Sequence, residues 1–479
     1  MADHTLLIRN ARLIDGSGTP SVIGDLAVSG DRITAMGDLA GSAADKVIDA
    51  DGLALAPGFI DSHCHDDRAI LDMPLLEPKV SQGVTTVING NCGLSIAPVL
   101  PNRPDAPAPL DFFTSDGARN FPDFNAYFSA LEQTPPAVNA ACLCGHSNLR
   151  HATMDTLDRA ASSVEIAQMC ALLGQALEAG AIGLSTGLYY PPATAAATEE
   201  VVEISKILAA RGGLYVTHMR NEEDNVIQSL EETFRIGRDA GVPVIVSHHK
   251  CMSKPNHGKS KITLAMIDAA RKHQSVGLDV YPYAASSTIL QPERVSKCAR
   301  VMITWSDAMP EVSGRDLSDI AREMGCTDEE AAHKLLPGGA VYFQMSEEDV
   351  QRILAYPDTM IGSDGIVHDK HPHPRAWGTF PRVLGHYARD EGLFPLEIAV
   401  HKMTGLTAGT FGLADRGTLR AGNFADLALF DPSTILDVAD FVDPCRPAQG
   451  IEMVFTNGVC TWKDGNSTGN TPGRALRRS

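Results

Sequence analysis

Two histidines, His63 and His65, stand directly after the apolar segment 59–62, with one cysteine between them. Successive side chains of a strand point to opposite faces, so residues i and i+2 share a face and the two imidazoles converge. Imidazole nitrogen is a common zinc ligand, and the pair predicts one part of a metal site. Two buried histidines satisfied by hydrogen bonds would give the same pattern, so the prediction depends on further ligands.

Further residues of metal-ligand type follow other apolar segments of the chain. Zinc accepts imidazole nitrogen, thiolate sulfur and carboxylate oxygen, and a catalytic site leaves one position open for water. Such water ionises near neutral pH, and a carboxylate beside it can take that proton and pass it to a leaving amine. The candidate ligands are His63, His65, Cys92, His218, His248 and Asp364, and Asp364 is also the candidate acid/base. His249 adjoins His248 and would face the opposite side of a strand, so spacing alone leaves the choice between these two open.

The segments that carry these residues alternate with helical patterns. Helices are expected at 166–179, 199–210 and 222–240, with the stop signals Gly180, Gly212-Gly213 and Gly241, and Ser162 with Glu165 forms a capping box before the first. This alternation predicts an α/β fold, a TIM (β/α)8 barrel, whose active sites lie at the carboxyl ends of the strands. The eight expected strands are 59–62, 84–88, 138–143, 182–185, 214–217, 244–247, 277–280 and 359–362.

Both ends of the chain are rich in short alternating runs, which predict antiparallel strands and a small β-sandwich domain built from the two termini. The expected division is 1–57 for its N-terminal part, 58–410 for the barrel and 411–479 for its C-terminal part. The connection at about 284–358 is too long for a simple βα unit and is expected to be an insertion. It is well placed to act as a lid, and packing against the side of the barrel is the equally weighted alternative.

The run 57–65, Pro-Gly-Phe-Ile-Asp-Ser-His-Cys-His, resembles the amidohydrolase superfamily, which combines a metal-dependent barrel with a small β-sandwich. The chain is most similar to the D-aminoacylases, which are N-acyl-D-amino-acid deacylases. The turn Gly-Asn-Cys-Gly at 90–93 is the most specific piece. The similar pieces span the whole barrel and lie at 83–87, 90–93, 145–147, 217–220, 247–250, 362–365 and 373–375.

The resemblance implies two metal positions, one with a tightly bound zinc and one weaker. The ligands matched to the tight position are Cys92, His218 and His248, and those matched to the weaker position are His63, His65 and Asp364. This match selects His248 rather than His249. Many amidohydrolases bridge two metals with a carboxylated lysine after the fourth strand. This chain has Gly-Leu-Ser-Thr-Gly at 183–187 instead, so the Cys92 thiolate is expected to take part of that role.

The resemblance also implies a set of substrate-binding residues: Tyr190, Lys250, Tyr281, Ser287 and Arg375. Arg375 would hold an α-carboxylate bidentately, with Lys250 and Tyr281 beside it. Tyr190 would polarise the scissile carbonyl, and Ser287 would border the side-chain pocket. The alternatives are ion pairs at the barrel rim for the two cations and simple packing for Tyr190.

The side chain of the substrate is expected to be neutral or hydrophobic, because the candidate cations are needed for the α-carboxylate. Arg294 or Lys297, within the expected insertion, would serve a second carboxylate. The alternative of an acidic substrate side chain therefore stays open.

The composition sets limits on the class of protein. A formal net charge of −19 over 479 residues disfavours nucleic acid and anionic membrane surfaces as partners and fits a small-molecule substrate. The first residues lack the basic and apolar regions of a secretory signal, and the ten cysteines have no framework spacing. A reduced, cytoplasmic protein is therefore expected.

These observations predict a zinc-dependent hydrolase that cleaves N-acyl-D-amino acids into a carboxylate and a free D-amino acid. One alternative keeps the fold and changes the substrate to a cyclic amide, as in hydantoinases or dihydroorotases. The missing lysine after the fourth strand and the Cys92 turn count against it. A second alternative, a non-catalytic scaffold with the same fold, predicts broken ligand positions, whereas all six are present.

Overall fold

The computed structural model describes residues 3–100, 106–111 and 120–478. Eight parallel strands form its centre in the order β16-β12-β11-β10-β9-β8-β7-β6, which confirms the predicted barrel. The first and last strands also meet, since the Ser62 amide donates to the Ile361 carbonyl at 3.2 Å. The strands are β6 (Phe59–Asp61), β7 (Val84–Asn89), β8 (Asn139–Gly145), β9 (Gly183–Gly187), β10 (Leu214–His218), β11 (Val244–Val246), β12 (Val276–Val280) and β16 (Thr359–Ile361).

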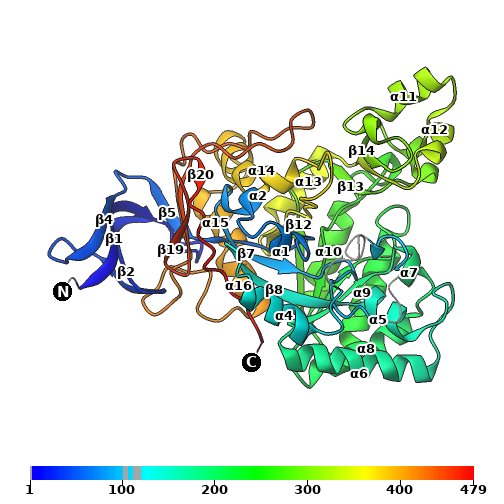
Figure 1. Cartoon of the computed structure of the whole chain (residues 1–479), viewed down its shortest axis with the longest axis horizontal. Coiled ribbons are helices and arrows are strands. Elements are labelled where there is room, and N and C mark those ends of the chain that lie inside the picture. The colour runs from blue at the N-terminus through cyan, green and yellow to red at the C-terminus, as the bar shows by residue number, and fades with distance from the viewer. Residues whose placement is uncertain (1–2, 101–105, 112–119, 479) are drawn as a thin grey trace.

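Helices cover the outside of this barrel (Figure 1), and the strands are buried along almost their whole length because side chains pack against both faces. The capping box of Ser162 and Glu165 begins α6 as predicted. No helix in the described ranges is long and apolar enough to cross a membrane. The main barrel helices are α4 (Phe124–Gln133), α5 (His146–Thr153), α6 (Ser163–Ala179), α8 (Thr198–Ala209), α9 (Val226–Ala240), α10 (Ser260–Arg271), α13 (Glu347–Ala355) and α15 (Leu396–Met403).

The helix predicted from residue 222 begins four residues later, at Val226. The side-chain oxygen of Asn221 accepts hydrogen bonds from the amides of Glu223 and Asn225, at 2.9 and 3.0 Å. This local bonding competes with the helix and holds the segment in a turn. Glu222 is therefore buried in the loop that follows β10 rather than placed on a helix.

Strands from both ends of the chain form one nine-stranded sheet around a separate apolar core, at the left of Figure 1. The sheet is not wholly antiparallel, contrary to the prediction, because β4 and β5 both run parallel to β1. Both strands follow the β2–β3 hairpin in the chain. They lie along the edge of β1 opposite to β2 and run in the same direction as β1. The strands are β1 (His4–Leu13), β2 (Val22–Ser29), β3 (Arg32–Gly37), β4 (Ala44–Asp49), β5 (Ala54–Pro57), β17 (Leu427–Phe430), β18 (Ile451–Thr456), β19 (Val459–Lys463) and β20 (Asn466–Ser467).

The C-terminal tail leaves this sheet and returns to the barrel. The amide of Ala140, in β8, donates to the Arg474 carbonyl at 2.9 Å, and the Leu476 amide donates to the Ala140 carbonyl at 2.7 Å. The last described residues therefore pair with the amino-terminal end of a barrel strand, on the side opposite to the carboxyl ends.

The connection between β12 and β16 contains an antiparallel sheet in the order β13-β15-β14 and has its own apolar core. Its outer part projects from the barrel (Figure 1, upper right). Strand β13 brings Ser286, Ser287 and Thr288 toward the carboxyl ends of the barrel strands. The elements are β13 (Ala285–Ile289), η3 (Pro292–Lys297), β14 (Arg300–Ser306), α11 (Leu317–Met324), α12 (Asp328–Lys334) and β15 (Gly338–Phe343).

Candidate metal centre

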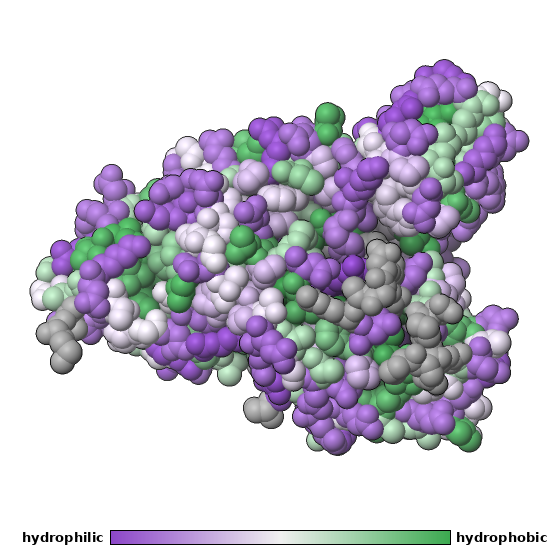
Figure 2. Space-filling model, viewed as in Figure 1, coloured by the Kyte–Doolittle hydropathy of each residue, from purple (hydrophilic) through white to green (hydrophobic). Residues whose placement is uncertain are grey.

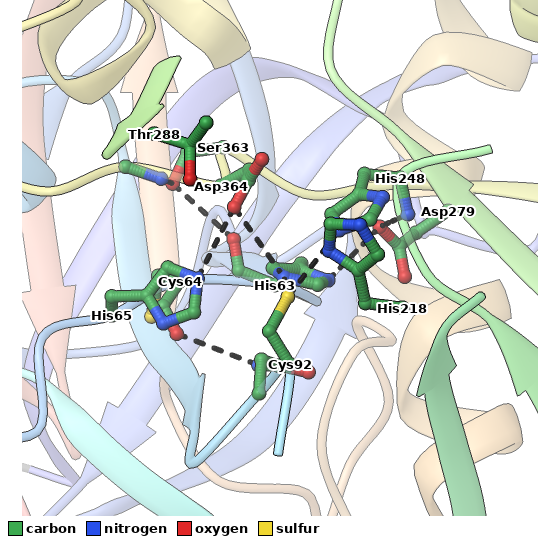
Figure 3. Close-up of polar contacts among 12 residues, drawn as sticks. His63, Cys64, His65, Cys92, His218, His248, Asp279, Thr288, Ser363 and Asp364 are labelled. Carbon is green, nitrogen blue, oxygen red and sulfur yellow. Dashed lines mark hydrogen bonds and ion pairs between the residues drawn. The ribbon is translucent and has the colours of Figure 1, made fainter. Parts of the chain in front are cut away.

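The six candidate ligands lie together at the carboxyl ends of the barrel strands (Figure 3). They form two groups, within each of which the ligand atoms lie within 4.8 Å of one another. The first group is Cys92, His218 and His248, and the second is His63, His65, Cys92 and Asp364. Cys92 belongs to both, so its sulfur connects the two halves of the cluster.

The Cys92 sulfur points into the space between the imidazoles (Figure 3). It lies 3.3 Å from Nε2 of His63 and 3.3 Å from Nε2 of His248. Burial alone would raise the pKa of the thiol, but these two imidazoles outweigh it and hold the Cys92 pKa well below its usual value. The side chain is thus held as a thiolate, the form that binds metal.

The backbone is strained at three of the ligands. Cys92, His248 and Asp364 have φ values of 56°, 34° and 49°, in a region that side chains other than glycine rarely adopt. Such strain persists where the surrounding structure imposes it, most often at functional sites.

The turn that carries Cys92 packs over the end of β9. A Cβ atom on Gly187 would lie 2.1 Å from the Cys92 carbonyl oxygen. The sharp turn therefore excludes a side chain at this position. Glycine at position 187 therefore allows the cysteine turn to pack against the end of the fourth barrel strand.

Two buried carboxylates that the sequence analysis did not identify hold the imidazole rings. Nδ1 of His63 lies 3.4 Å from Asp279, and Nδ1 of His248 lies 3.1 Å from Glu222. Histidines that bind metal commonly donate their second ring N–H to a carboxylate, which fixes the ring and its tautomer. The sequence does contain a signal for each of them. Asp279 is an isolated charge inside an apolar strand, and Glu222 follows His218 by four residues.

The structure decides between the neighbouring residues His248 and His249, because their side chains point in different directions. His248 faces the cluster, whereas His249 turns away and its Nε2 lies 2.7 Å from the Thr263 hydroxyl on α10. Burial lowers the pKa of His249 to about 4. His249 is therefore a neutral core residue, and His248 is the one placed to bind metal.

Asp364 links the cluster to Arg375. One carboxylate oxygen of Asp364 lies 3.2 Å from Nε2 of His65, and the other lies 2.9 Å from Nη1 of Arg375. Burial alone would raise the pKa of Asp364, but Arg375 and His248 hold it well below its usual value. Asp364 is therefore ionised and able to accept a proton.

The five predicted substrate-binding residues surround the cluster. The Tyr190 ring centroid lies 5.0 Å from that of His218, and its hydroxyl lies 3.2 Å from the Thr288 hydroxyl. The Arg375 guanidinium carbon lies 4.5 Å from the Tyr281 ring centroid, and Nη2 donates to the Ser287 carbonyl at 3.2 Å.

Lys250 and Arg375 both form ion pairs, but within the site rather than at the outer rim. Nζ of Lys250 lies 2.8 Å from Glu222, which also holds His248, and Arg375 pairs with Asp364. Both cations are buried, so water screens their positive charge only weakly.

Arg294 reaches the same pocket from the insertion. It is buried, and it lines the pocket with Tyr190 and Lys250. Its guanidinium donates to the neutral side chains of Gln291 and Met252, and among the described residues its Nε has no hydrogen-bond partner. Lys297, the other open candidate, instead pairs with Glu223 at 2.7 Å.

The residues fit a metal of the zinc type. They provide one thiolate, four imidazoles and one carboxylate, which is the donor set that zinc prefers. Nε2 of His218 lies 3.3 Å from the Glu222 carboxylate, whereas its Nδ1 is buried without a hydrogen-bond partner in the described part of the chain. Buried polar atoms are rarely left without partners, so this imidazole is suited to a ligand that protein atoms do not supply.

Comparison with known proteins gives a consistent picture. The model of the amidohydrolase family matches residues 46–271 and 292–468. A D-aminoacylase and an N-acyl-D-aspartate deacylase, both from Alcaligenes xylosoxydans xylosoxydans, are 55% and 49% identical to this chain. Each alignment covers 99% of this chain, with 98% and 95% of the respective relative. The solved N-acyl-D-glutamate deacylase of Bordetella bronchiseptica, complexed with zinc and a phosphonate inhibitor that mimics the tetrahedral intermediate, has a TM-score of 0.95. It is 45% identical and aligns over 99% of both chains.

Proposed function

Because this chain belongs to the amidohydrolase family and, within it, to the D-aminoacylases, we propose that it hydrolyses N-acyl-D-amino acids to a carboxylate and a free D-amino acid. The reaction depends on metal. The observation that carries the proposal is the position of Cys92, whose sulfur joins the two ligand groups at the carboxyl end of the barrel.

The metal is zinc, held tightly by Cys92, His218 and His248. A thiolate and two imidazoles suit zinc and leave a position for water, and the similar deacylase that is complexed with zinc supports this choice. A second, weaker position is formed by His63, His65 and Asp364, with Cys92 shared between the two. When bound, zinc polarises the acyl carbonyl and makes water acidic.

Asp364 moves the proton. Its carboxylate is ionised and lies at the edge of the ligand cluster, so it accepts a proton from the attacking water. It then returns that proton to the amide nitrogen as the carbon–nitrogen bond breaks, which completes acid and base catalysis with one residue. Arg375, at 2.9 Å, stabilises the ionised form between turnovers.

The substrate is held at both ends of its reacting amide. Arg375, Lys250 and Tyr281 bind the α-carboxylate, because charge-assisted hydrogen bonds from buried cations are the strong ones. The Tyr190 hydroxyl donates a hydrogen bond to the acyl carbonyl oxygen and so polarises it. Burial raises the pKa of Tyr190 well above its usual value, so this hydroxyl stays protonated. Ser287 borders the substrate side chain.

The sequence prediction of a neutral or hydrophobic side chain stays a prediction, and the position of Arg294 gives a specific reason for a second candidate. Its guanidinium is buried in the pocket, and within the described ranges its side-chain hydrogen bonds go to the neutral Gln291 and Met252. A D-glutamate or D-aspartate side chain would supply the missing carboxylate. Arg294→Leu distinguishes the neutral from the acidic side-chain preference. If the enzyme prefers an acidic side chain, kcat/KM for N-acetyl-D-glutamate should fall in this variant, and kcat/KM for N-acetyl-D-methionine should stay unchanged.

The partner of this site is a small molecule, and the reducing cytoplasm is the proposed location. All ten cysteines lie in the described part of the chain, and none of them is in a disulfide. Cysteines remain reduced in the cytoplasm, which supports this location.

The test compares N-acetyl-D-methionine and N-acetyl-D-glutamate with their L-forms, with and without zinc, by the release of free amine. Zinc-dependent release from a D-form alone supports the proposal. A hydantoin is assayed in parallel, and turnover of the hydantoin alone would overturn the linear-amide assignment in favour of a cyclic amide hydrolase. Absence of turnover of every substrate by zinc-loaded protein would favour a non-catalytic scaffold.

A further inference from the structure

Three cavities follow one another across the carboxyl face of the barrel. The first is the pocket of Lys250, Arg294 and His248 described above. The second shares Tyr190, Ser287, Thr288 and Asp364 with the first and is otherwise lined mainly by apolar residues. The third, of about 720 Å³, shares Pro109, Ile289 and Trp305 with the second. Neighbouring cavities in the series therefore adjoin one another, and the candidate metal ligands line the first two.

The third cavity lies between the insertion and helix α1 (Ala69–Asp72). Figure 2 shows the outer part of the insertion as a lobe that projects at the upper right. The apolar part of its lining consists of Met73, Ile289, Leu290, Trp305, Leu336 and Pro337. Leu336 and Met73 are 39% and 40% exposed, so the cavity presents large apolar side chains to solvent.

Charged side chains also line this cavity, among them the exposed Asp111 and Asp307. Arg68 and Asp72 pair with each other at 2.8 Å, one turn apart on α1. The other end of the series is different, since it holds the buried cations Lys250 and Arg294. Buried cations therefore lie at one end of the series, whereas the cavity at the other end combines large apolar side chains with charged ones.

We propose that the 720 Å³ cavity is the subsite for the acyl chain, and that the enzyme acts on N-acyl-D-amino acids with acyl groups much longer than acetyl. This rests on the proposed function. With the α-carboxylate at Arg375 and Lys250 and the scissile carbonyl beside Asp364 and Tyr190, the acyl chain is the remaining part of the substrate. It continues past Ile289 and Trp305 into the third cavity, along the large apolar side chains of its lining.

The size and lining of the cavity suit such a chain. Ligand pockets typically measure about 300–1,000 Å³, and a medium-length acyl chain occupies only part of this space. Burial of one methylene changes affinity by roughly threefold to fourfold. Lengthening acetyl to octanoyl is therefore expected to raise kcat/KM by at least about tenfold, chiefly by lowering KM.

The test measures kcat/KM of the zinc-loaded enzyme for the N-acetyl, N-hexanoyl and N-octanoyl derivatives of one D-amino acid. Leu336→Glu and Met73→Glu place a charge at partly exposed positions, where the fold tolerates it. Both are expected to lower kcat/KM for the octanoyl substrate about tenfold and to leave the acetyl substrate unaffected. Val442→Glu changes an exposed side chain outside the cavity and is the matched control, expected to leave both substrates unaffected.

Two results would overturn the acyl subsite while the proposed function stands: hydrolysis of the acetyl substrate with no gain for the octanoyl one, or an octanoyl-to-acetyl ratio that neither variant changes. If no D-substrate of any chain length is hydrolysed, the proposed function itself fails. The acetyl reaction thus distinguishes the two failures.

Discussion

The carboxylate of Glu222 lies 3.1 Å from Nδ1 of His248, and the other ring nitrogen of His248 faces Cys92. Glu222 also pairs with Lys250 at 2.8 Å, so one buried carboxylate links a candidate ligand to a candidate substrate-binding cation. Burial alone would raise the pKa of Glu222, but Lys250 and the two neighbouring imidazoles hold it well below its usual value.

Glu222→Gln is expected to lower zinc affinity about 10- to 100-fold, because removal of a carboxylate that orients a ligand typically has an effect of this size. The measurement is competition for zinc with a chelator. Glu223→Gln is the matched control, since Glu223 pairs instead with Lys297 of the insertion. Equal zinc affinity in the two variants would contradict the role given to Glu222.

His248→Asn and His249→Asn are expected to differ, although the residues are neighbours. The first removes a nitrogen 3.3 Å from the Cys92 sulfur, and the second removes only a hydrogen bond to Thr263. His248→Asn should lose zinc and activity, whereas His249→Asn should keep both at a cost of about 1 kcal/mol of stability. Zinc content is measured by mass spectrometry. Loss of zinc in His249→Asn but not in His248→Asn would reverse the assignment.

Asp364→Asn is expected to lower kcat about 10²- to 10⁴-fold, the usual contribution of a general acid or base. The amide is similar in size but cannot accept the proton. Single-turnover kinetics measure the loss, and thermal melting verifies that the fold is kept. Turnover close to that of the wild type would remove Asp364 from the mechanism.

Lys79 ties together the first and last strands of the barrel. Its amino group lies 2.7 Å from Asp61 and 2.8 Å from the Ser363 hydroxyl, and all three side chains are buried. Lys79→Met leaves the buried Asp61 charge without its partner and is expected to destabilise the protein by about 3–5 kcal/mol. Urea unfolding measures this. The double variant with Asp61→Asn should recover part of the loss, and a loss equal to the sum of the single variants would argue against the pairing.

Lys402 gives a prediction for alkaline pH. Burial lowers its pKa to about 8 from 10.5 in the unfolded chain. Between these values the unfolded state binds more protons, so the free energy of unfolding rises with pH in this window and is insensitive to this group below it. Relative to Lys402→Met, the wild type should therefore gain stability from pH 8 to 10.5. Denaturant titrations across this range measure the difference, and a flat difference would refute the shift.

The sequence by itself determined the barrel and the chemical types of the ligands. Apolar segments such as 84–88 and 214–217 lie within one residue of the observed strands. Buried parallel strands leave this local pattern wherever they occur. Because active sites of such barrels form at the carboxyl ends of the strands, the positions of Cys92 in the turn beyond β7 and of His218 at the end of β10 were sufficient to group them.

Only the tertiary structure decided how these residues meet. The central position of Cys92, the exclusion of a side chain at Gly187 and the contacts of Glu222 and Asp279 all join segments far apart in the chain. The sheet of the insertion also had no local signal, since β13 is half-buried and pairs with residues some fifty positions away. Local periodicity encodes single elements, whereas such contacts result from the packing of the whole barrel, which no short segment specifies.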